Sequence, residues 1–186
     1  LAKPGKHFKL SNWDTSDKGD FKDREQAEKQ IEKDVKKLAQ QQEVLYAQSK
    51  HAILIVLQAM DTGGKDGAIS HIFSGLNPQG ISVTSFKQPS HNELAHDFLW
   101  RIHAVTPRKG MIGIFNRSHY ESVLVERVHQ LVPGKVWEHR YEHINAFEKM
   151  LHDEGVTIMK FFLHISKDEQ KKRLQDRLDE DDKHWK

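Results

Sequence analysis

The spacing of apolar residues changes along the chain, and each change predicts a different element. Between residues 20 and 46 the chain is charged and lacks glycine and proline, and Ile31, Val35 and Leu38 recur at helical spacing. This pattern predicts an amphipathic helix packed on the domain. The unbroken apolar run at 52–57 is instead typical of a strand buried on both faces of a parallel sheet.

Further apolar runs predict three more strands, and amphipathic stretches between them predict helices. The strands are expected at 81–86, 111–115 and 156–163, and the helices near 65–74, 93–105, 120–130, 138–152 and 167–178. Alternating strands and helices indicate an α/β fold, with a central parallel sheet flanked by helices. The polar residues 1–20 predict an N-terminal arm, and residues 20–186 show no linker that would divide them into two domains.

Composition and charge exclude several classes of function. None of the 186 residues is cysteine, so disulfides, zinc thiolate sites and cysteine nucleophiles are ruled out, and a reducing cytoplasm is the expected compartment. The net charge is only +2, and the chain has no basic arm of the kind that binds nucleic acid. A nucleic-acid partner is therefore not expected. No signal peptide pattern and no run near the roughly 20 apolar residues of a membrane span is found. A bound polyanion would therefore be held by individually placed cations.

A glycine-rich segment joins the first predicted strand to the following helix. A strand, a glycine turn and a helix form the context of a phosphate-binding loop, in which backbone amides at the helix start point at the anion. Lys65 would contact the transferred phosphates. Ala59 and Asp66 depart from the P-loop pattern, so a purely structural turn is the alternative. Besides Lys65, the candidate phosphate-binding residues of this loop are Thr62, Gly63, Gly64, Asp66 and Gly67.

Asp61 places a carboxylate inside this loop, where it would repel phosphate. A divalent cation between the two removes the repulsion, because Mg²⁺ favours one or two carboxylates together with phosphate oxygens. A general base is the alternative role for Asp61. A phosphate acceptor is already ionised at neutral pH and needs no base, so the role of metal ligand is favoured.

The predicted strand 111–115 is followed by polar residues that should face the same crevice, because ligands of open α/β sheets bind at the carboxyl ends of the strands. Asn116 stands where an acid is usual, and its amide oxygen can ligate Mg²⁺. Arg117 and Arg127 are available to neutralise phosphate oxygens. The alternative for either arginine is an ion pair with Glu121 or Glu126.

Several segments in order resemble the polyphosphate kinase 2 family. They are 58–67, 77–80, 86–89, 96–101, 115–121 and 183–185, and Gly-Lys-Asp-Gly together with Phe-Asn-Arg-Ser-His-Tyr-Glu is most similar to the class III branch. The resemblance implies a P-loop kinase fold related to thymidylate kinases, with a helical lid. It also implies transfer of phosphoryl groups between inorganic polyphosphate and AMP or ADP, with Mg²⁺ or Mn²⁺, in a homodimer or homotetramer.

The resemblance also implies roles for single residues. Asp61 and Lys65 are similar to the metal-binding aspartate and the lysine of the family's loop. Four residues are similar to its second motif: Asn116, Arg117, Glu121 and Arg127. Lys87 is similar to a cation that meets nucleotide or chain phosphates.

The lid of the family is expected near residues 166–186. Arg173 and Arg177 resemble its arginines, and their spacing puts both on one face of the predicted helix 167–178. A solvated helix pairing them with Glu169 or Asp176 is the alternative. Family members usually continue for some tens of residues past this point, so the lid is expected to be cut short. Two other functions stay open: an ATP-dependent nucleoside monophosphate kinase of the same fold, and a non-catalytic module that binds polyanions or nucleotides.

Overall fold

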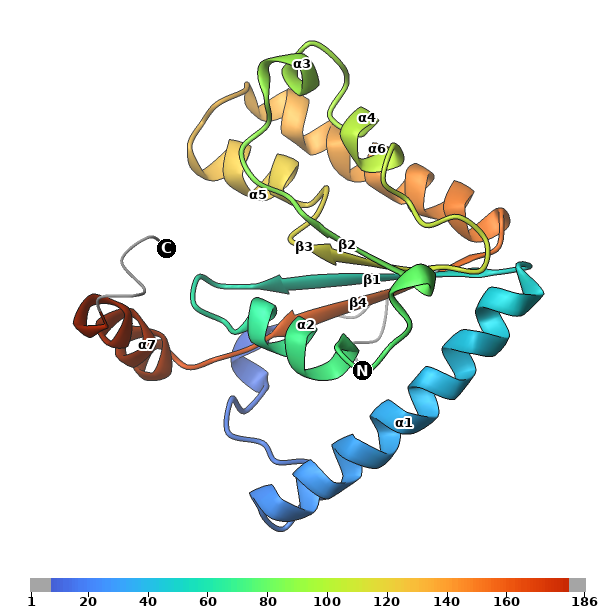
Figure 1. The fold of residues 1–186 in the computed structure, drawn as a ribbon. Coiled ribbons are helices and arrows are strands. Elements are labelled where there is room, and N and C mark those ends of the chain that lie inside the picture. Colours follow the sequence, from blue (N-terminus) through green and yellow to red (C-terminus); the bar gives the residue numbers. More distant parts are fainter. Residues whose placement is uncertain (1–7, 181–186) are drawn as a thin grey trace.

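The structure is a computed structural model, and it describes residues 8–180. Strands and helices alternate along most of the chain (Figure 1). The elements are η1 (Leu10–Asn12), α1 (Arg24–Gln48), β1 (Ala52–Ala59), α2 (Lys65–Phe73), η2 (Pro78–Gly80), β2 (Ile81–Ser85), α3 (His91–Leu94), α4 (Trp100–His103), β3 (Ile112–Asn116), α5 (Glu121–Val128), α6 (Gly134–Asp153), β4 (Val156–Leu163) and α7 (Lys167–Asp179).

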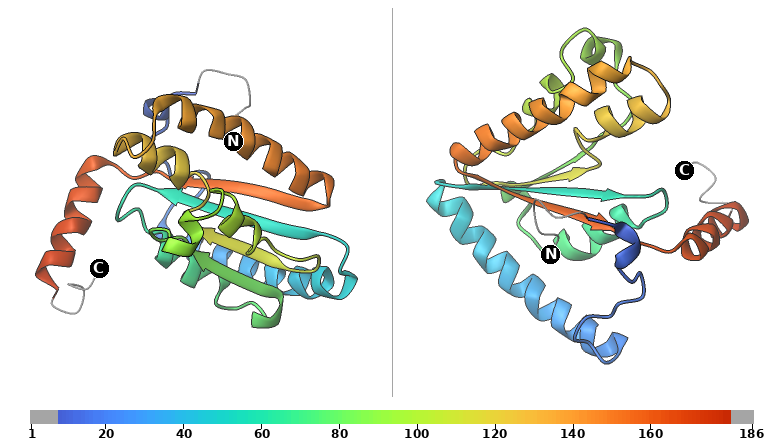
Figure 2. Two further views of the ribbon diagram at one scale, coloured as in Figure 1. Left: turned by 90° about the horizontal axis from the view of Figure 1, so that it is seen from above. Right: turned by 180° about the vertical axis from the view of Figure 1, so that it is seen from behind.

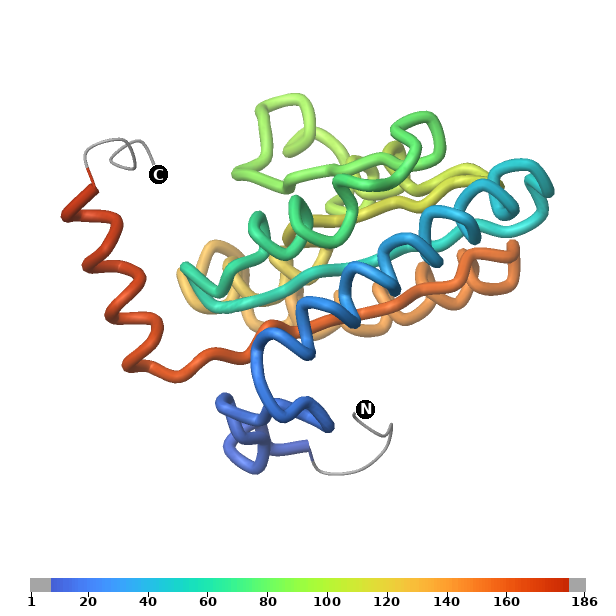
Figure 3. Tube along the Cα trace, turned by 60° about the horizontal axis from the view of Figure 1, so that its bottom comes forward, coloured from blue at the N-terminus to red at the C-terminus, as the bar shows by residue number. Residues whose placement is uncertain are grey.

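The strands form one parallel sheet in the order β2-β3-β1-β4. The helices α3 to α6 cover one face of the sheet, while α1 and α2 lie on the other (Figures 1 and 2). Helix α7 belongs to neither layer. It stands at the end of the sheet where β1 turns into α2 (Figure 3). The expected α/β fold with a central parallel sheet is therefore confirmed.

The side chains of β1 point alternately to the two faces of the sheet, and an apolar core lies on each face. Ala52, Leu54 and Val56 are buried on the α6 side, where Phe115 and Phe147 join them. The intervening residues of β1 belong to the second core, between the sheet and the helices α1 and α2. The predicted burial of β1 on both faces is thus correct, and the strand continues two residues further than expected, to Ala59.

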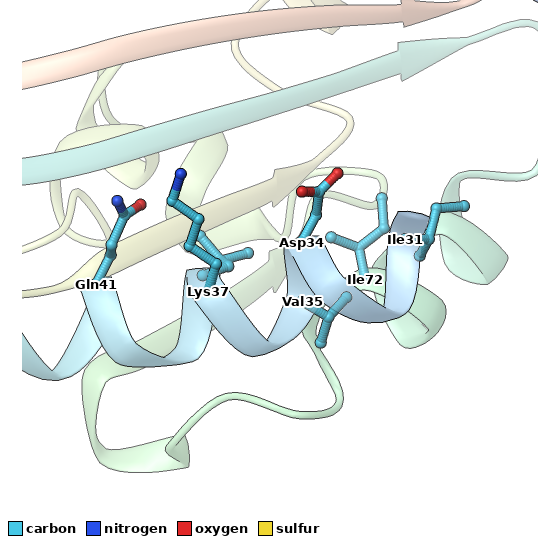
Figure 4. A pocket seen from close by; sticks show the side chains of 7 residues that line it. Ile31, Asp34, Val35, Lys37, Gln41 and Ile72 are labelled. Carbon is cyan, nitrogen blue, oxygen red and sulfur yellow. The ribbon is translucent and has the colours of Figure 1, made fainter. Parts of the chain in front are cut away.

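Helix α1 packs on the domain mainly through its second half. The buried Gln42 side chain bonds the backbone of Asn77, accepting from its N–H at 2.9 Å and donating to its carbonyl at 2.8 Å. Nearer its start, the predicted apolar stripe lines an open groove against Ile72 of α2 (Figure 4). The stripe residues in this groove are Ile31, Val35 and Leu38.

The single helix expected at 93–105 is wrong, because two short helices stand there. Ser90 and Glu93 form a reciprocal capping box that starts α3. The Asp97 carboxylate then accepts a hydrogen bond from the Leu99 N–H at 2.9 Å, which begins a new turn before α4. These local side-chain bonds interrupt a pattern that looks continuous in the sequence.

The two ends of the domain are described only in part. Residues 8–20 of the expected arm contain η1 and otherwise turns, bends and irregular chain. Residues 1–7 and 181–186 lie outside the described residues, including part of the expected arm, the last part of the expected lid and the motif 183–185. Within residues 8–180, no helix has the length and apolar character to cross a membrane.

Candidate active site

The glycine-rich loop turns tightly between β1 and α2. The Gly63 N–H donates to the Met60 carbonyl at 3.0 Å, and a β-carbon on Gly63 would lie 2.8 Å from that same oxygen. Gly64 has φ +90° and caps the start of α2. The first helical bond runs from Ala68 N–H to the Gly64 carbonyl, at 2.9 Å. The preceding amides of the first turn are thus available to an anion, as at other helix starts.

Charged groups from both sequence motifs converge beside the loop. Lys65 is partly buried at the start of α2. Burial lowers the pKa of Lys65, the nearby Arg117 guanidinium lowers it further, and the carboxylates of Asp61, Glu121 and Asp66 act in the opposite direction. Five charged side chains from two segments that are far apart in the sequence therefore interact beside the loop. Two of them, Lys65 and Arg117, are cations, and the other three are carboxylates.

The carboxyl end of β3 is joined to the loop by side-chain bonds. The Asn116 amide nitrogen donates to the Asp66 carboxylate at 2.6 Å, which leaves the Asn116 amide oxygen as an acceptor. The Arg117 N–H donates to the Leu57 carbonyl at 3.1 Å, and Arg117 has φ +64°. A non-glycine residue in this left-handed region carries strain of about 1–3 kcal/mol, and such strain is concentrated at functional sites.

The next residues of this segment are buried in a polar cluster. The Tyr120 hydroxyl donates to the Glu148 carboxylate of α6 at 2.7 Å, and the His119 Nε2 lies 3.1 Å from the same oxygen. Lys160 of β4 donates to the other Glu148 oxygen at 2.6 Å. Burial alone raises the pKa of Glu148, but the bonds from His119, Lys160 and Tyr120 outweigh it and lower the pKa to about 2. The cluster thus holds an ionised carboxylate behind the site.

Helix α7 closes onto the glycine-rich loop from the other side. Gln170 donates to the Asp61 carbonyl at 2.9 Å, and Arg173 donates to the Thr62 carbonyl at 3.2 Å. The Arg177 guanidinium lies 3.8 Å from the Asp61 carboxylate. Arg173 also pairs with Glu169 at 2.6 Å, as the alternative interpretation expected, and its role toward phosphate stays a prediction.

A model of the family described as Polyphosphate kinase 2 (PPK2) matches residues 20–186. The chain belongs to the polyphosphate kinase 2 family. An AMP/ADP-polyphosphate phosphotransferase from Meiothermus ruber is 54% identical over 186 residues, which cover 100% of this chain and 70% of that protein. An ADP-polyphosphate phosphotransferase from Rhodopseudomonas palustris is 46% identical, over 98% of this chain and 67% of that protein.

A solved member of the polyphosphate kinase 2 family has the same fold. The crystal structure of polyphosphate kinase 2 from Arthrobacter aurescens TC1 superposes with a TM-score of 0.93 at 43% identity, covering 98% of this chain and 66% of that one. The P-loop kinase fold expected for this family is therefore confirmed. The chain spans about two thirds of the length of these relatives.

Most residues that the family resemblance singled out lie around the loop. The exceptions are Arg127 and Lys87, whose contacts lie elsewhere. The Arg127 guanidinium stacks over the Trp137 ring at 4.8 Å, and Glu126, one of its expected partners, pairs with Arg140 instead. Lys87 follows β2, and its side chain is exposed. A role for Arg127 and Lys87 in this polyphosphate kinase 2 member stays a prediction.

The structure adds supporting residues that the motifs did not include. Gln170 precedes Arg173 by three residues, so helical spacing alone would have placed it on the same face of α7. Glu148 and Lys160 carried no comparable signal, because α6 and β4 meet the second motif only in the folded sheet. Arg101, inside the resembling segment 96–101, donates to the Lys87 carbonyl at 3.0 Å and thereby fixes the loop that carries Lys87.

Proposed function

We propose that this chain transfers phosphoryl groups between inorganic polyphosphate and AMP or ADP, forming ADP and ATP. The observation that carries the proposal is the meeting of Lys65 and Arg117 beside the glycine-rich loop. Lys65 and Arg117 can neutralise phosphate oxygens, and the nearby carboxylates suit a divalent cation bound between them and the phosphates. The family and the names of the relatives support polyphosphate and adenine nucleotides as the substrates.

The mechanism follows from charge placement. Phosphoryl transfer passes through a loose, metaphosphate-like transition state, so catalysis depends on aligning the two phosphates and neutralising their oxygens. Lys65 and Arg117 neutralise the transferred group, and the amides at the start of α2 bind it. Arg173 and Arg177 of α7 approach the same loop, which supports a role for both in contacting the phosphate chain. Arg127 and Lys87 are proposed to serve more distant phosphates.

The donor set at the loop fits a Mg²⁺ or Mn²⁺ ion. The Asp61 side chain is 67% exposed, and the amide oxygen of Asn116 is left as an acceptor by the bond to Asp66. One carboxylate, one amide oxygen, phosphate oxygens and water form a ligand set typical of Mg²⁺. When bound, the ion would neutralise phosphate charge. Asp61 and Asn116 are the residues proposed to hold it.

The deciding experiment supplies long-chain polyphosphate and no ATP. AMP, ADP, GMP and GDP are assayed in parallel, with Mg²⁺ and after chelation. We expect ADP and ATP to form from the adenine nucleotides only when Mg²⁺ is present. Lys65→Met should abolish product formation, while Lys50→Met, which changes an exposed lysine before β1, serves as the matched control.

The outcomes separate the proposal from its rivals. Product from ATP and AMP, with none from polyphosphate, would identify an ATP-dependent nucleoside monophosphate kinase. Calorimetric binding of polyphosphate without any nucleotide product would identify a binding module. Either result would overturn the proposed reaction.

We also propose that the protein is a homodimer or homotetramer in the cytoplasm. A chain without cysteine suits a reducing compartment. Light scattering coupled to size exclusion should give two or four times the 21.7 kDa of one chain. A mass of a single chain at micromolar concentration would contradict the proposed assembly.

A further inference from the structure

A cluster of polar side chains lies directly behind the second motif. It joins three parts of the fold: the segment that follows β3, the middle of α6, and β4. Both oxygens of the Glu148 carboxylate are engaged, one by Tyr120 and His119 and the other by Lys160. Lys160 also donates to the Tyr120 hydroxyl at 2.9 Å. The four side chains therefore form one closed network.

Burial makes this network costly to disturb. The His119 side chain is fully buried and that of Glu148 is 13% exposed, while Lys160 is 47% exposed. A buried carboxylate requires a positive partner and several hydrogen bonds to remain ionised, and Lys160, Tyr120 and His119 meet this requirement. Removing the charge of Glu148 would leave the Lys160 ammonium without its partner and weaken the bonds that Glu148 forms with His119 and Tyr120.

The network adjoins the residues that face the phosphate loop. Tyr120 is the N-cap of α5, and Glu121 is the first residue of that helix. His119 comes two residues after Arg117, whose φ of +64° persists only if its surroundings hold it. From the side of β1, the Arg117 N–H is bonded to Leu57, and Ser118 accepts a bond from Gln58 at 2.8 Å. The segment is thus held by the strand on one side and by Glu148 on the other.

Helix α6 provides a rigid base for Glu148. The neighbouring residue Phe147 and Leu151, one turn further on, are both buried in the core against β1. The Phe147 ring also meets the ring of His119, with centroids 6.0 Å apart. The carboxylate therefore occupies a fixed place relative to the sheet.

We propose that Glu148 is a positioning residue for phosphoryl transfer, because its carboxylate holds His119 and Tyr120 so that Arg117 and Glu121 stay beside Lys65. The inference rests on the proposed function for its kinetic consequence only. The holding of the segment itself is a property of the fold and can be measured without any substrate.

The kinetic test compares two substitutions that each convert an acid of α6 to its amide. Glu148→Gln keeps the size of the side chain and removes its charge. Asp153→Asn is the matched control, because Asp153 forms an exposed pair with Lys149 on the same helix, at 2.6 Å. Both variants are assayed at a temperature below the onset of their thermal unfolding. We expect Glu148→Gln to lower kcat at least about tenfold with little change in KM, and the kcat of Asp153→Asn to stay within about twofold of that of the unchanged chain. An unchanged kcat in folded Glu148→Gln would overturn the proposal.

A double-mutant cycle asks whether Glu148 acts through Arg117. If it does, Glu148→Gln should cost much less in an Arg117→Ala background than in the unchanged chain. Equal losses in both backgrounds would contradict the positioning role and indicate a general effect on the fold. Tyr120→Phe, which removes one of the bonds to Glu148, should give a smaller loss of kcat than Glu148→Gln.

Hydrogen exchange of backbone amides tests the physical basis without activity. In Glu148→Gln, residues 116–121 should exchange faster than in the unchanged chain, while Asp153→Asn should leave them as they are. Unaltered exchange at 116–121 would overturn the inference whether or not the chain is active. Faster exchange in a chain that makes no product from polyphosphate would instead contradict the proposed function and leave Glu148 as the group that holds the segment.

Discussion

At the scale of single residues, the shape of the glycine-rich loop depends on the absence of a side chain at Gly63. A β-carbon on Gly63 would meet the Met60 carbonyl oxygen and the Ala59 side chain. Gly67, two residues into α2, has open space at the same position. The two glycines of one motif therefore serve different purposes, and a matched pair of alanine substitutions can separate them.

Gly63→Ala should destabilise the protein, since part of the loop backbone has to shift to accommodate the methyl group. Gly67→Ala should leave the stability unchanged or raise it by up to about 0.5 kcal/mol, because Gly67 lies in the first turn of α2 and alanine has the higher helix propensity. The free energy of unfolding in urea measures both effects. Equal changes in the two variants would show that the close contact at Gly63 does not constrain the loop.

Asp61 contributes a carboxylate that is mostly exposed, accepts a hydrogen bond from the Thr62 N–H at 2.9 Å and lies 3.8 Å from the Arg177 guanidinium. Because its fold contacts are few, Asp61→Asn should lower the turnover of polyphosphate by orders of magnitude and leave the melting temperature nearly unchanged. Steady-state rates across a Mg²⁺ titration, together with thermal unfolding, provide the measurement. A variant that retains a near-normal rate would exclude Asp61 as the metal-binding residue.

Residues that belong to recognisable sequence motifs could be predicted from the sequence. Lys65 and Arg117 could be expected at one crevice, because the carboxyl ends of parallel strands meet there. Glu148 could not, because a glutamate in the middle of an amphipathic helix looks like any other surface acid until the helix is packed. The stacking of Arg127 on Trp137 was equally hidden, since it depends on the turn between α5 and α6.

At the scale of elements, α7 is attached to the loop by few bonds. Within residues 8–180, two hydrogen bonds join this helix to the loop: Gln170 donates to the Asp61 carbonyl and Arg173 donates to the Thr62 carbonyl. A helix held in this way can move away from the loop at modest cost, which suits an element that must admit a long substrate.

Gln170→Ala should therefore raise the KM for polyphosphate by about tenfold, while the unfolding temperature stays the same. Gln175→Ala is the matched control, because Gln175 donates to Asp179 of the same helix at 2.9 Å, away from the loop. The KM values for polyphosphate and for ADP are measured separately. A rise confined to ADP would show that α7 does not guide the phosphate chain.

The contact of α6 with β4 should make stability depend on acid pH. The pKa of Glu148 is lowered to about 2 in the folded chain, against 4.5 for the free side chain. Because the folded chain lowers this pKa, the ionised carboxylate stabilises the fold, by up to a few kcal/mol, at every pH above the pKa of the unfolded chain. This stabilisation is lost as the pH falls from about 4.5 towards 2. Glu148→Gln should flatten that part of the curve of unfolding free energy against pH. An unchanged slope would mean that the carboxylate is not held as described.

The elements themselves were predictable where periodicity was uninterrupted. The strand expected at 156–163 is confirmed at both ends, and α1 begins where Asp23 caps it, three residues inside the expected stretch. The helix at 93–105 failed because capping bonds of Ser90 and Asp97 divide it. Sheet order was not predictable, because it depends on pairings between segments that no local pattern connects.

At the scale of the whole molecule, a net charge of +2 provides little overall attraction for a polyanion, so the attraction has to come from the cations near the glycine-rich loop, which are Lys65, Arg117, Arg173 and Arg177. Attraction of a polyanion to such a cluster is screened by salt over a Debye length of roughly 10 Å at 0.1 M. The KM for long-chain polyphosphate should therefore rise several-fold between about 50 and 500 mM KCl, with a smaller change in kcat. Steady-state kinetics at fixed free Mg²⁺ measure it. A KM independent of salt would show that these cations do not attract the chain.

The order of the sheet has a consequence for how the protein is made. Strand β1 lies between β3 and β4, so Ile53 pairs with Ile112 and Thr157, both far ahead of it in the chain. During synthesis, the apolar segment 52–57 leaves the ribosome long before either neighbour exists. Folds dominated by such distant pairings form slowly, and their intermediates expose apolar surface that is prone to aggregation. Efficient production of this enzyme should thus depend on chaperones that shield β1 until translation has passed residue 163.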